Sequence, residues 1–198
     1  MFIVLEGIDG CGKSTQIINL ADFFFHQDKY NHIVVTREPY RRREIREILK
    51  TNEMPNEKKD QLVYLFVEDR KEHFKEVIIP SLNRGHIVLC DRYKYSTICY
   101  QSAQGFSLER LLDMHRFMPV PDLVFVFDVN VETALKRVSY DYSRKKESKF
   151  EQKNFLEVVR RNYLSLNELF PDENIILIDG NESERVVFEK IKKAIQKI

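Results

Sequence analysis

Five short, strongly apolar runs recur along the chain and are separated by longer amphipathic stretches. Runs of this length with almost continuous apolar character are typical of β-strands that are covered on both faces of a parallel sheet. The sequence therefore predicts five parallel strands. They are Phe2–Glu6, Ile33–Thr36, Ile87–Cys90, Leu123–Asp128 and Ile175–Ile178.

The stretches between these runs carry charged residues with apolar residues at helical spacing, which predicts helices. Strands that alternate with helices favour an α/β fold with a five-stranded parallel sheet and helices on both faces. At 198 residues, without repeats or a Pro/Gly-rich linker, the chain is predicted to form a single domain over residues 1–198. The predicted helices are Thr15–Phe25, Lys58–Leu82, Val131–Tyr142, Phe155–Leu169 and Glu184–Lys197.

The segment between the first predicted strand and the first predicted helix reads G-x-x-x-x-G-K-S. Its glycines allow a tight turn whose N–H groups face an anion, and the helix N-terminus that follows favours negative charge. Lys13 is expected to reach the β- and γ-phosphates of a nucleoside triphosphate, and the Ser14 hydroxyl to hold Mg²⁺. A Gly-rich turn without function is the alternative, and the strand–loop–helix context disfavours it. The predicted ATP-binding loop comprises Gly7, Ile8, Asp9, Gly10, Cys11, Gly12, Lys13, Ser14 and Thr15.

The third predicted strand ends in an acid, Asp91, followed by Arg92. An Asp in this place can hold the hydration shell of Mg²⁺ together with Ser14, whereas the structural alternative is a cap for the next helix. The Arg92 guanidinium presents a planar fork that suits phosphate oxygens. We therefore predict a metal site at Ser14 and Asp91 and a phosphate-binding role for Arg92.

Composition and charge limit the classes of binding partner that the sequence predicts. Lys and Arg total 32 against 31 Asp and Glu, so overall charge gives no reason to expect nucleic acid as a partner. No apolar run is long enough to span a bilayer, and we expect no membrane partner. The three cysteines (Cys11, Cys90 and Cys99) lack metal-ligand spacing and suit free thiols in a reducing compartment. We expect a cytoplasmic protein.

Six segments occur together in one order: residues 2–16, Thr36–Pro39, Leu65–His73, Asp91–Ser96, Cys99–Gln101 and Pro121–Leu123. With these segments the chain resembles the thymidylate kinases, a family of P-loop nucleoside monophosphate kinases. The resemblance implies the three-layer P-loop kinase fold and the transfer of a phosphoryl group from ATP to dTMP, giving ADP and dTDP. It also implies Mg²⁺ as cofactor and a homodimer.

The resemblance further implies roles at the dTMP site. Phe66 and Arg70 are four residues apart and lie on one helix face; Phe66 would stack on thymine and Arg70 would hydrogen-bond its carbonyl edge. Asp9 would lie near the sugar hydroxyl, and Tyr100 would leave no room for a 2′-hydroxyl. Thr97 and Gln101 are weaker candidates for contact with the base. The predicted dTMP-binding residues are Asp9, Pro39, Arg41, Phe66, Arg70, Arg92, Thr97, Tyr100 and Gln101.

The chain departs from the family pattern after Pro39, where it continues Tyr40-Arg41-Arg42-Arg43 in place of paired glycines and a threonine. An arginine shortly after the proline holds the acceptor phosphate in other branches. We choose Arg41 for this role, with Arg42 and Arg43 as alternatives.

A second departure is Gly10, where some members carry a basic residue within the loop. The charge that neutralises the transition state must then come from elsewhere. The polar, basic segment Tyr142–Glu151 is a candidate lid, and Arg144 is our choice among Arg144, Lys145, Lys146 and Lys149. Arg137 is expected to stack on adenine. The predicted catalytic residues are Lys13, Arg92 and Arg144.

Two alternative functions remain open at this point. A kinase for another deoxynucleotide or deoxynucleoside would share the loop, although a deoxynucleoside kinase has no need of an arginine for an acceptor phosphate. An ATP-binding switch would bind nucleotide without transferring phosphate. Activity that depends on an acceptor distinguishes these classes.

Overall fold

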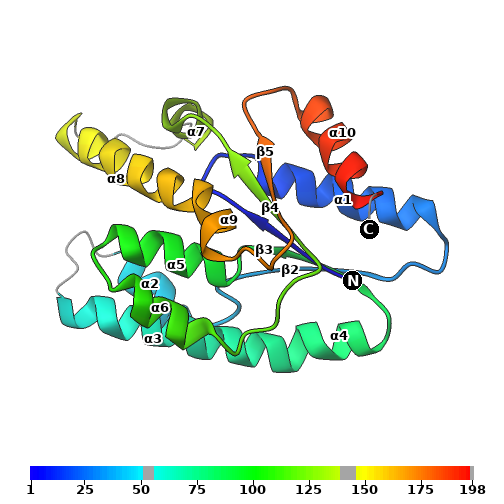
Figure 1. Ribbon diagram of the computed structural model, residues 1–198, viewed down its shortest axis with the longest axis horizontal. Helices are drawn as coiled ribbons and strands as arrows, with labels where there is room; N and C mark the ends of the chain where they lie inside the picture. Colours follow the sequence, from blue (N-terminus) through cyan, green and yellow to red (C-terminus); the bar gives the residue numbers. More distant parts are fainter. Residues whose placement is uncertain (51–55, 139–145, 197–198) are drawn as a thin grey trace.

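The computed structural model describes residues 1–50, 56–138 and 146–196. Its centre is a five-stranded parallel sheet with strand order β2-β3-β1-β4-β5 (Figure 1). The predicted fold class is confirmed, and three of the predicted strands extend one residue further. The strands are β1 (Phe2–Glu6), β2 (Ile33–Arg37), β3 (Ile87–Asp91), β4 (Leu123–Asp128) and β5 (Ile175–Asp179).

The inner strands explain the apolar runs of the sequence. Every residue of β1 is buried, including Glu6. In β3 and β4 every residue except the last is buried, and the last is half-buried. The edge strand β2 is only half covered, and Val35 is 53% exposed. A sheet whose centre is covered on both faces requires apolar residues at successive positions rather than at alternate ones.

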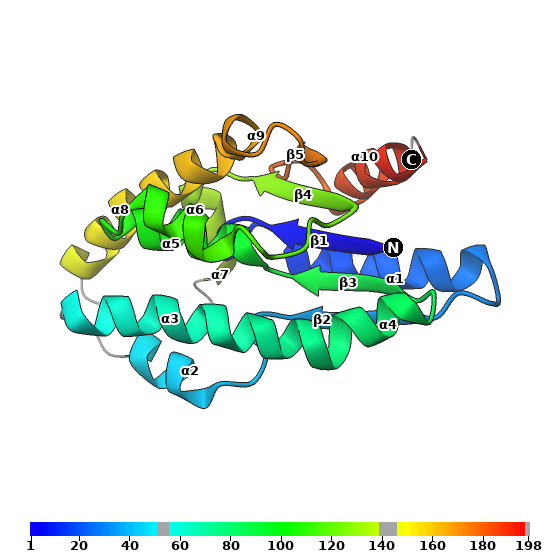
Figure 2. The ribbon, with the colours of Figure 1, turned by 60° about the horizontal axis from the view of Figure 1, so that its bottom comes forward.

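Helices cover the two faces of the sheet as separate layers (Figures 1 and 2). On one face, α1 (Lys13–Gln27) packs against β1, β2 and β3, and α10 (Glu184–Ile195) packs against β5 and α1. On the other face, α4 (Ile79–Asn83) contacts β3, and α8 (Lys146–Leu164) contacts β4 and α5 (Lys94–Ala103). Because all five strands run parallel, the segments that follow their carboxyl ends meet at one edge of the sheet. Ligands bind at this edge in open α/β folds.

The predicted helix Lys58–Leu82 is a helical rod interrupted by a π-helical turn. The turn is marked by the hydrogen bond from the Ile79 N–H to the Phe74 carbonyl, five residues earlier. Pro80 has no N–H to donate, and its ring would clash with the carbonyl of an α-helical turn, which explains why the helix widens here. The three parts are α3 (Asn56–His73), η1 (Phe74–Ile78) and α4 (Ile79–Asn83).

Other helix boundaries were predicted less accurately. α7 covers Val131–Val138, and the rest of the helix predicted to Tyr142 lies outside the described residues. The helix predicted from Phe155 begins earlier, because α8 covers Lys146–Leu164 and includes residues 146–151 of the candidate lid. The short helix α6 has no predicted counterpart. The remaining helices are α2 (Arg43–Lys50), α5 (Lys94–Ala103), α6 (Leu108–His115) and α9 (Leu166–Leu169).

Within the described parts of the chain, no helix combines the length and apolar character needed to cross a bilayer.

Candidate active site

The Gly-rich loop joins the carboxyl end of β1 to the first turn of α1. Gly7, Gly10 and Gly12 all adopt positive φ angles of 137°, 82° and 104°, a region that side chains disfavour. The Lys13 ammonium is buried and donates hydrogen bonds to the carbonyls of Gly7 and Ile8, each at 3.0 Å. The lysine side chain therefore curls around the loop, and α1 begins without a side-chain cap on its N-terminal N–H groups.

Position 10 has no space for a side chain. A Cβ atom on Gly10 would collide with the Ala134 carbonyl oxygen of α7 and lie 2.9 Å from a methyl group of Val138. The close packing of α7 on the loop thus gives a physical reason for Gly10, where some family members carry a basic residue. The structure therefore excludes a basic side chain at position 10.

Arg92 lies directly beside this loop. Its backbone has a φ of 73°, unusual for a residue other than glycine, and its Nη2 atom lies 2.5 Å from Oδ1 of Asp9. Partial loss of water around the carboxylate acts to raise the pKa of Asp9 even though its side chain is 74% exposed, but the charges of Arg92 and Lys13 outweigh this effect and leave the pKa below its usual value. Arg92 and Asp9 therefore form an ion pair between β3 and the loop.

A buried carboxylate that sequence reasoning missed, Glu6, holds the side chains that bind Arg92. Glu6 accepts hydrogen bonds from the Tyr93 N–H at 2.7 Å, from the Ser96 hydroxyl at 2.6 Å and from the Tyr163 hydroxyl at 3.0 Å. Ser96 and Tyr163 in turn accept hydrogen bonds from Nη1 of Arg92. The signal in the sequence was a glutamate at the end of a strand that is otherwise wholly apolar.

Two oxygen-bearing side chains fit a metal held mainly by a nucleotide. Oδ1 of Asp91 is buried and has no hydrogen-bond partner among the described residues, and Ser14 lies exposed in the first turn of α1. The described residues contain no cluster of three or more His, Cys, Asp or Glu side chains suited to a metal. Mg²⁺ needs only one or two protein ligands when phosphates and water supply the others, so Ser14 and Asp91 are chemically adequate.

A cavity of about 320 Å³ opens beside Arg92 and is lined by residues from the loop, β2–α2, α2, α3 and α5. Eight of the nine acceptor-site residues predicted from the sequence line it: Asp9, Pro39, Phe66, Arg70, Arg92, Thr97, Tyr100 and Gln101. The ninth, Arg41, does not. Sequence reasoning missed five further lining residues, which are Glu38, Leu49, Tyr93, Ser96 and Gln104.

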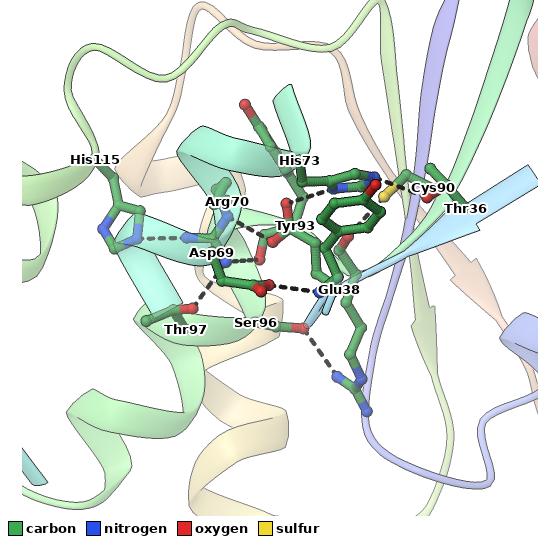
Figure 3. A network of polar contacts seen from close by, with 12 residues as sticks. Thr36, Glu38, Asp69, Arg70, His73, Cys90, Tyr93, Ser96, Thr97 and His115 are labelled. Carbon is green, nitrogen blue, oxygen red and sulfur yellow. Dashed lines mark hydrogen bonds and ion pairs between the residues drawn. The ribbon is translucent and has the colours of Figure 1, made fainter. Parts of the chain in front are cut away.

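Arg70 is the most heavily bonded side chain of this cavity (Figure 3). It is 1% exposed, and its Nε atom donates to Glu38 at 2.6 Å. Nη2 donates to the Tyr93 carbonyl at 3.2 Å and to the Thr97 hydroxyl at 3.0 Å, and Nη1 lies 2.6 Å from Nε2 of His115. The guanidinium is thus fixed by groups from three segments, which are the loop after β2, the start of α5 and the end of α6.

The loop after Pro39 is held to α3 by Asp69. The carboxylate of Asp69 is 1% exposed and accepts hydrogen bonds from the backbone N–H groups of Tyr40, Arg41 and Arg42 at 2.5, 3.0 and 2.9 Å. Three successive N–H groups on one carboxylate fix the course of the loop that borders the cavity.

The side chain of Arg41 points to acids of the α3–η1 rod. Its two Nη atoms each lie 2.8 Å from an oxygen of Glu76, and Nε lies 3.3 Å from Glu72. Arg42 also pairs with Glu72, and Arg43 is exposed. None of the three arginines lines the cavity, so the structure does not bring the predicted phosphate ligand to the other predicted residues.

A second, smaller cavity of about 240 Å³ also borders the loop. Four of the residues predicted to bind ATP line it, which are Cys11, Gly12, Thr15 and Arg137. Arg137 donates to the Gly180 carbonyl at 3.2 Å and to the Gly10 carbonyl at 3.4 Å, which links the loop to the segment after β5. The lining residues that sequence reasoning missed are Gln16, Gly180, Glu182, Glu184 and Val187.

The predicted lid cation Arg144 lies outside the described residues, and so does Lys145. Lys146 and Lys149 belong to the first turns of α8. Their catalytic assignment stays a prediction.

Comparisons with known proteins agree with this geometry. The family model described as Thymidylate kinase matches residues 5–191. A probable thymidylate kinase of Thermococcus kodakarensis is 41% identical over 186 residues, covering 89% of this chain and 88% of the relative. A probable thymidylate kinase of Pyrococcus abyssi is 40% identical, with 88% and 86% covered, and a thymidylate kinase of Brachyspira hyodysenteriae is 35% identical, with 98% and 92% covered.

Proposed function

The chain belongs to the thymidylate kinase family, and from this membership we propose that it transfers the γ-phosphate of ATP to dTMP, giving ADP and dTDP. One observation carries the proposal. Eight residues predicted for dTMP line a single cavity, and one of them, Asp9, belongs to the phosphate-binding loop itself. Donor and acceptor sites therefore share a boundary, as direct transfer between two bound nucleotides requires.

At the donor side, phosphoryl transfer needs positioning and charge neutralisation more than covalent chemistry. The exposed first turn of α1 and the loop N–H groups suit the β- and γ-phosphates of ATP. The Lys13 ammonium, which binds loop carbonyls at 3.0 Å, is placed to exchange them for phosphate oxygens. Mg²⁺, for which we propose Ser14 and Asp91 as ligands, would supply further positive charge to the phosphates.

At the acceptor side, Phe66 and Arg70 are proposed to bind the thymine base and Tyr100 to bear on the sugar. The Tyr100 ring packs against the Arg92 guanidinium, with 5.4 Å between the ring centroid and Cζ of Arg92. The buried hydroxyl of Tyr100 has no hydrogen-bond partner among the described residues. Burial raises the pKa of Tyr100 to about 12 against the opposing charge of Arg92, so the hydroxyl stays neutral. A rigid ring in this place favours deoxyribose by excluding a 2′-hydroxyl.

Arg92 stands between the two sides and is proposed to bind the phosphate that is transferred. Arg144 is proposed to add charge from the lid, because position 10 leaves no space for a second basic side chain beside Lys13 within the loop. Family membership also supports Arg41 as ligand of the acceptor phosphate, which requires its side chain to leave Glu76. We further propose a homodimer that works in the cytoplasm; light scattering after size-exclusion chromatography tests the first of these.

An ADP-release assay with Mg²⁺-ATP tests the proposed reaction. The acceptors are dTMP, dUMP, dCMP, dGMP, UMP and thymidine. We expect the highest turnover with dTMP, less with dUMP and little with UMP. Preference for another acceptor would retain the kinase and overturn the assignment of the base pocket. ATP binding without acceptor-dependent turnover would overturn the kinase and favour a nucleotide-dependent switch.

A further inference from the structure

Arg70 has one donor left over after its contacts inside the protein. A guanidinium carries five N–H groups. Four of them have acceptors: Nε–H binds Glu38, both Nη2 hydrogens bind Tyr93 and Thr97, and one Nη1 hydrogen binds His115. Within the described residues, the second hydrogen of Nη1 has no acceptor. Arg70 lines the acceptor cavity, and this hydrogen is the one N–H of its guanidinium for which the described residues leave a bound base to act as acceptor.

The tautomer of His115 follows from its two partners. Nδ1 lies 2.7 Å from the Leu111 carbonyl, which can only accept, so Nδ1 carries the hydrogen. Nε2 lies 2.6 Å from Nη1 of Arg70, which can only donate, so Nε2 presents its lone pair. The imidazole is therefore neutral, 2% exposed and locked as an acceptor for one nitrogen of Arg70.

His115 differs from the other partners of Arg70 in the edge that it holds. Glu38, Tyr93 and Thr97 all bind the Nε–Nη2 side of the guanidinium, whereas His115 alone among the described residues binds Nη1. The hydrogen available to a base sits on the same nitrogen. The guanidinium is rigid and planar, so the direction of this hydrogen depends on where the whole group is held, and His115 is the contact that holds it at the Nη1 end.

We propose that His115 is a positioning residue for base recognition, which orients the remaining Nη1 hydrogen of Arg70 toward the 4-carbonyl of thymine. The inference rests on the proposed function, since it takes dTMP as the acceptor. Cytosine carries an amino group at this position, and a fixed donor facing another donor is repulsive. His115 would thus set the preference for dTMP over dCMP without contacting either nucleotide.

The test measures equilibrium dissociation constants for dTMP, dCMP and ATP by calorimetry. In His115→Leu, which removes the acceptor, we expect the Kd for dTMP to rise about tenfold and the ratio of the dCMP and dTMP constants to fall. In His115→Gln, whose amide oxygen can accept from Nη1, we expect the ratio to be largely restored. The Kd for ATP should stay unchanged in both, because α6 does not line the ATP-side cavity.

Leu111→Ala is the matched control, because it weakens the packing of the same helix and leaves the backbone carbonyl that holds His115. It should lower stability without changing the dCMP-to-dTMP ratio. If His115→Leu does not fold, His115→Met takes its place, because Met is of similar size and only a weak acceptor. An unchanged ratio in His115→Leu or His115→Met, or an equal loss in His115→Gln, would overturn the inference. Failure of the wild-type chain to bind dTMP would overturn the proposed function and the inference with it.

Discussion

Replacement of Asp69 by Asn should weaken both the fold and the binding of the acceptor. The carboxylate of Asp69 is buried and accepts three backbone hydrogen bonds from the loop after Pro39. Oδ1 accepts two of them and Oδ2 accepts the third, from Tyr40. An asparagine can keep its oxygen toward the first two donors, but its NH₂ group then faces the Tyr40 N–H, and two donors oppose each other.

The size of the effect follows from these contacts. A hydrogen bond to a charged group contributes about 1.5–3 kcal/mol, and an unsatisfied buried donor costs about 1–3 kcal/mol. Asp69→Asn loses one such bond outright and removes the charge from two others. We therefore expect the free energy of unfolding to fall by about 2–4 kcal/mol. The KM for dTMP should rise, because Pro39 lines the acceptor cavity, whereas the KM for ATP should not change.

Urea denaturation followed by circular dichroism measures the stability, and initial rates with each substrate varied measure the two KM values. Asp113→Asn is the control, because Asp113 forms an exposed ion pair with Arg116 at 2.9 Å and its loss should be hardly measurable. An unchanged midpoint in Asp69→Asn would refute the hydrogen-bond argument. A loss of stability with an unchanged KM for dTMP would show that the loop does not shape the acceptor site.

Three further predictions concern other parts of the molecule. Lys13→Ala should abolish turnover while circular dichroism still shows a folded chain, with a lower unfolding temperature because the bonds to the Gly7 and Ile8 carbonyls are lost, and a rate near that of the wild type would contradict the role of the loop. Arg144→Ala should lower kcat by about 10²–10³-fold with a smaller change in KM, whereas an effect on KM alone would reassign Arg144 to ATP binding. Burial and the charges of Arg70 and Lys94 lower the pKa of His115 to about 3 from an ordinary value of 6.5, against the opposing Leu111 hydrogen bond. The unfolded state then binds a proton that the folded state does not, so stability is lost as the pH falls from about 6.5. Measured against His115→Gln by urea denaturation at several pH values, this loss should approach about 1.4 kcal/mol per pH unit between pH 4 and 6.

The strands could be predicted to within one residue because their signal is local. A strand in a covered sheet is apolar at every position, and the run ends where the chain reaches the polar edge of the sheet. The helix boundaries had no such sharp signal. Residues 146–154 are so polar that the amphipathic pattern first becomes visible at Phe155, although α8 begins at Lys146. Pro80 is the sequence feature that marks the break in the long helix, because a proline in a helix interior removes an N–H donor.

The lining of the acceptor cavity was also largely predictable, because the motifs follow strand ends that the topology brings together. The contacts within it were not. His115 lies 45 residues from Arg70 along the chain, and nothing in its neighbourhood indicates that pairing. The direction of Arg41 was equally hidden in a run of three arginines. Glu72 and Glu76, four residues apart on one helical face, were the only hint of where that side chain would bind.

Burial separates the roles of the arginines at this site. Arg70 and Glu38 form an ion pair with side chains only 1% and 4% exposed, and breaking such a pair by removing one partner costs about 3–5 kcal/mol. Arg70 therefore keeps Glu38 when a nucleotide binds and has only its remaining N–H to offer, which suits a neutral base carbonyl and not a phosphate. Arg92 is different, because its partner Asp9 is 74% exposed and can be solvated when released. An arginine whose carboxylate can move into water is the one that can exchange it for the phosphate of a substrate.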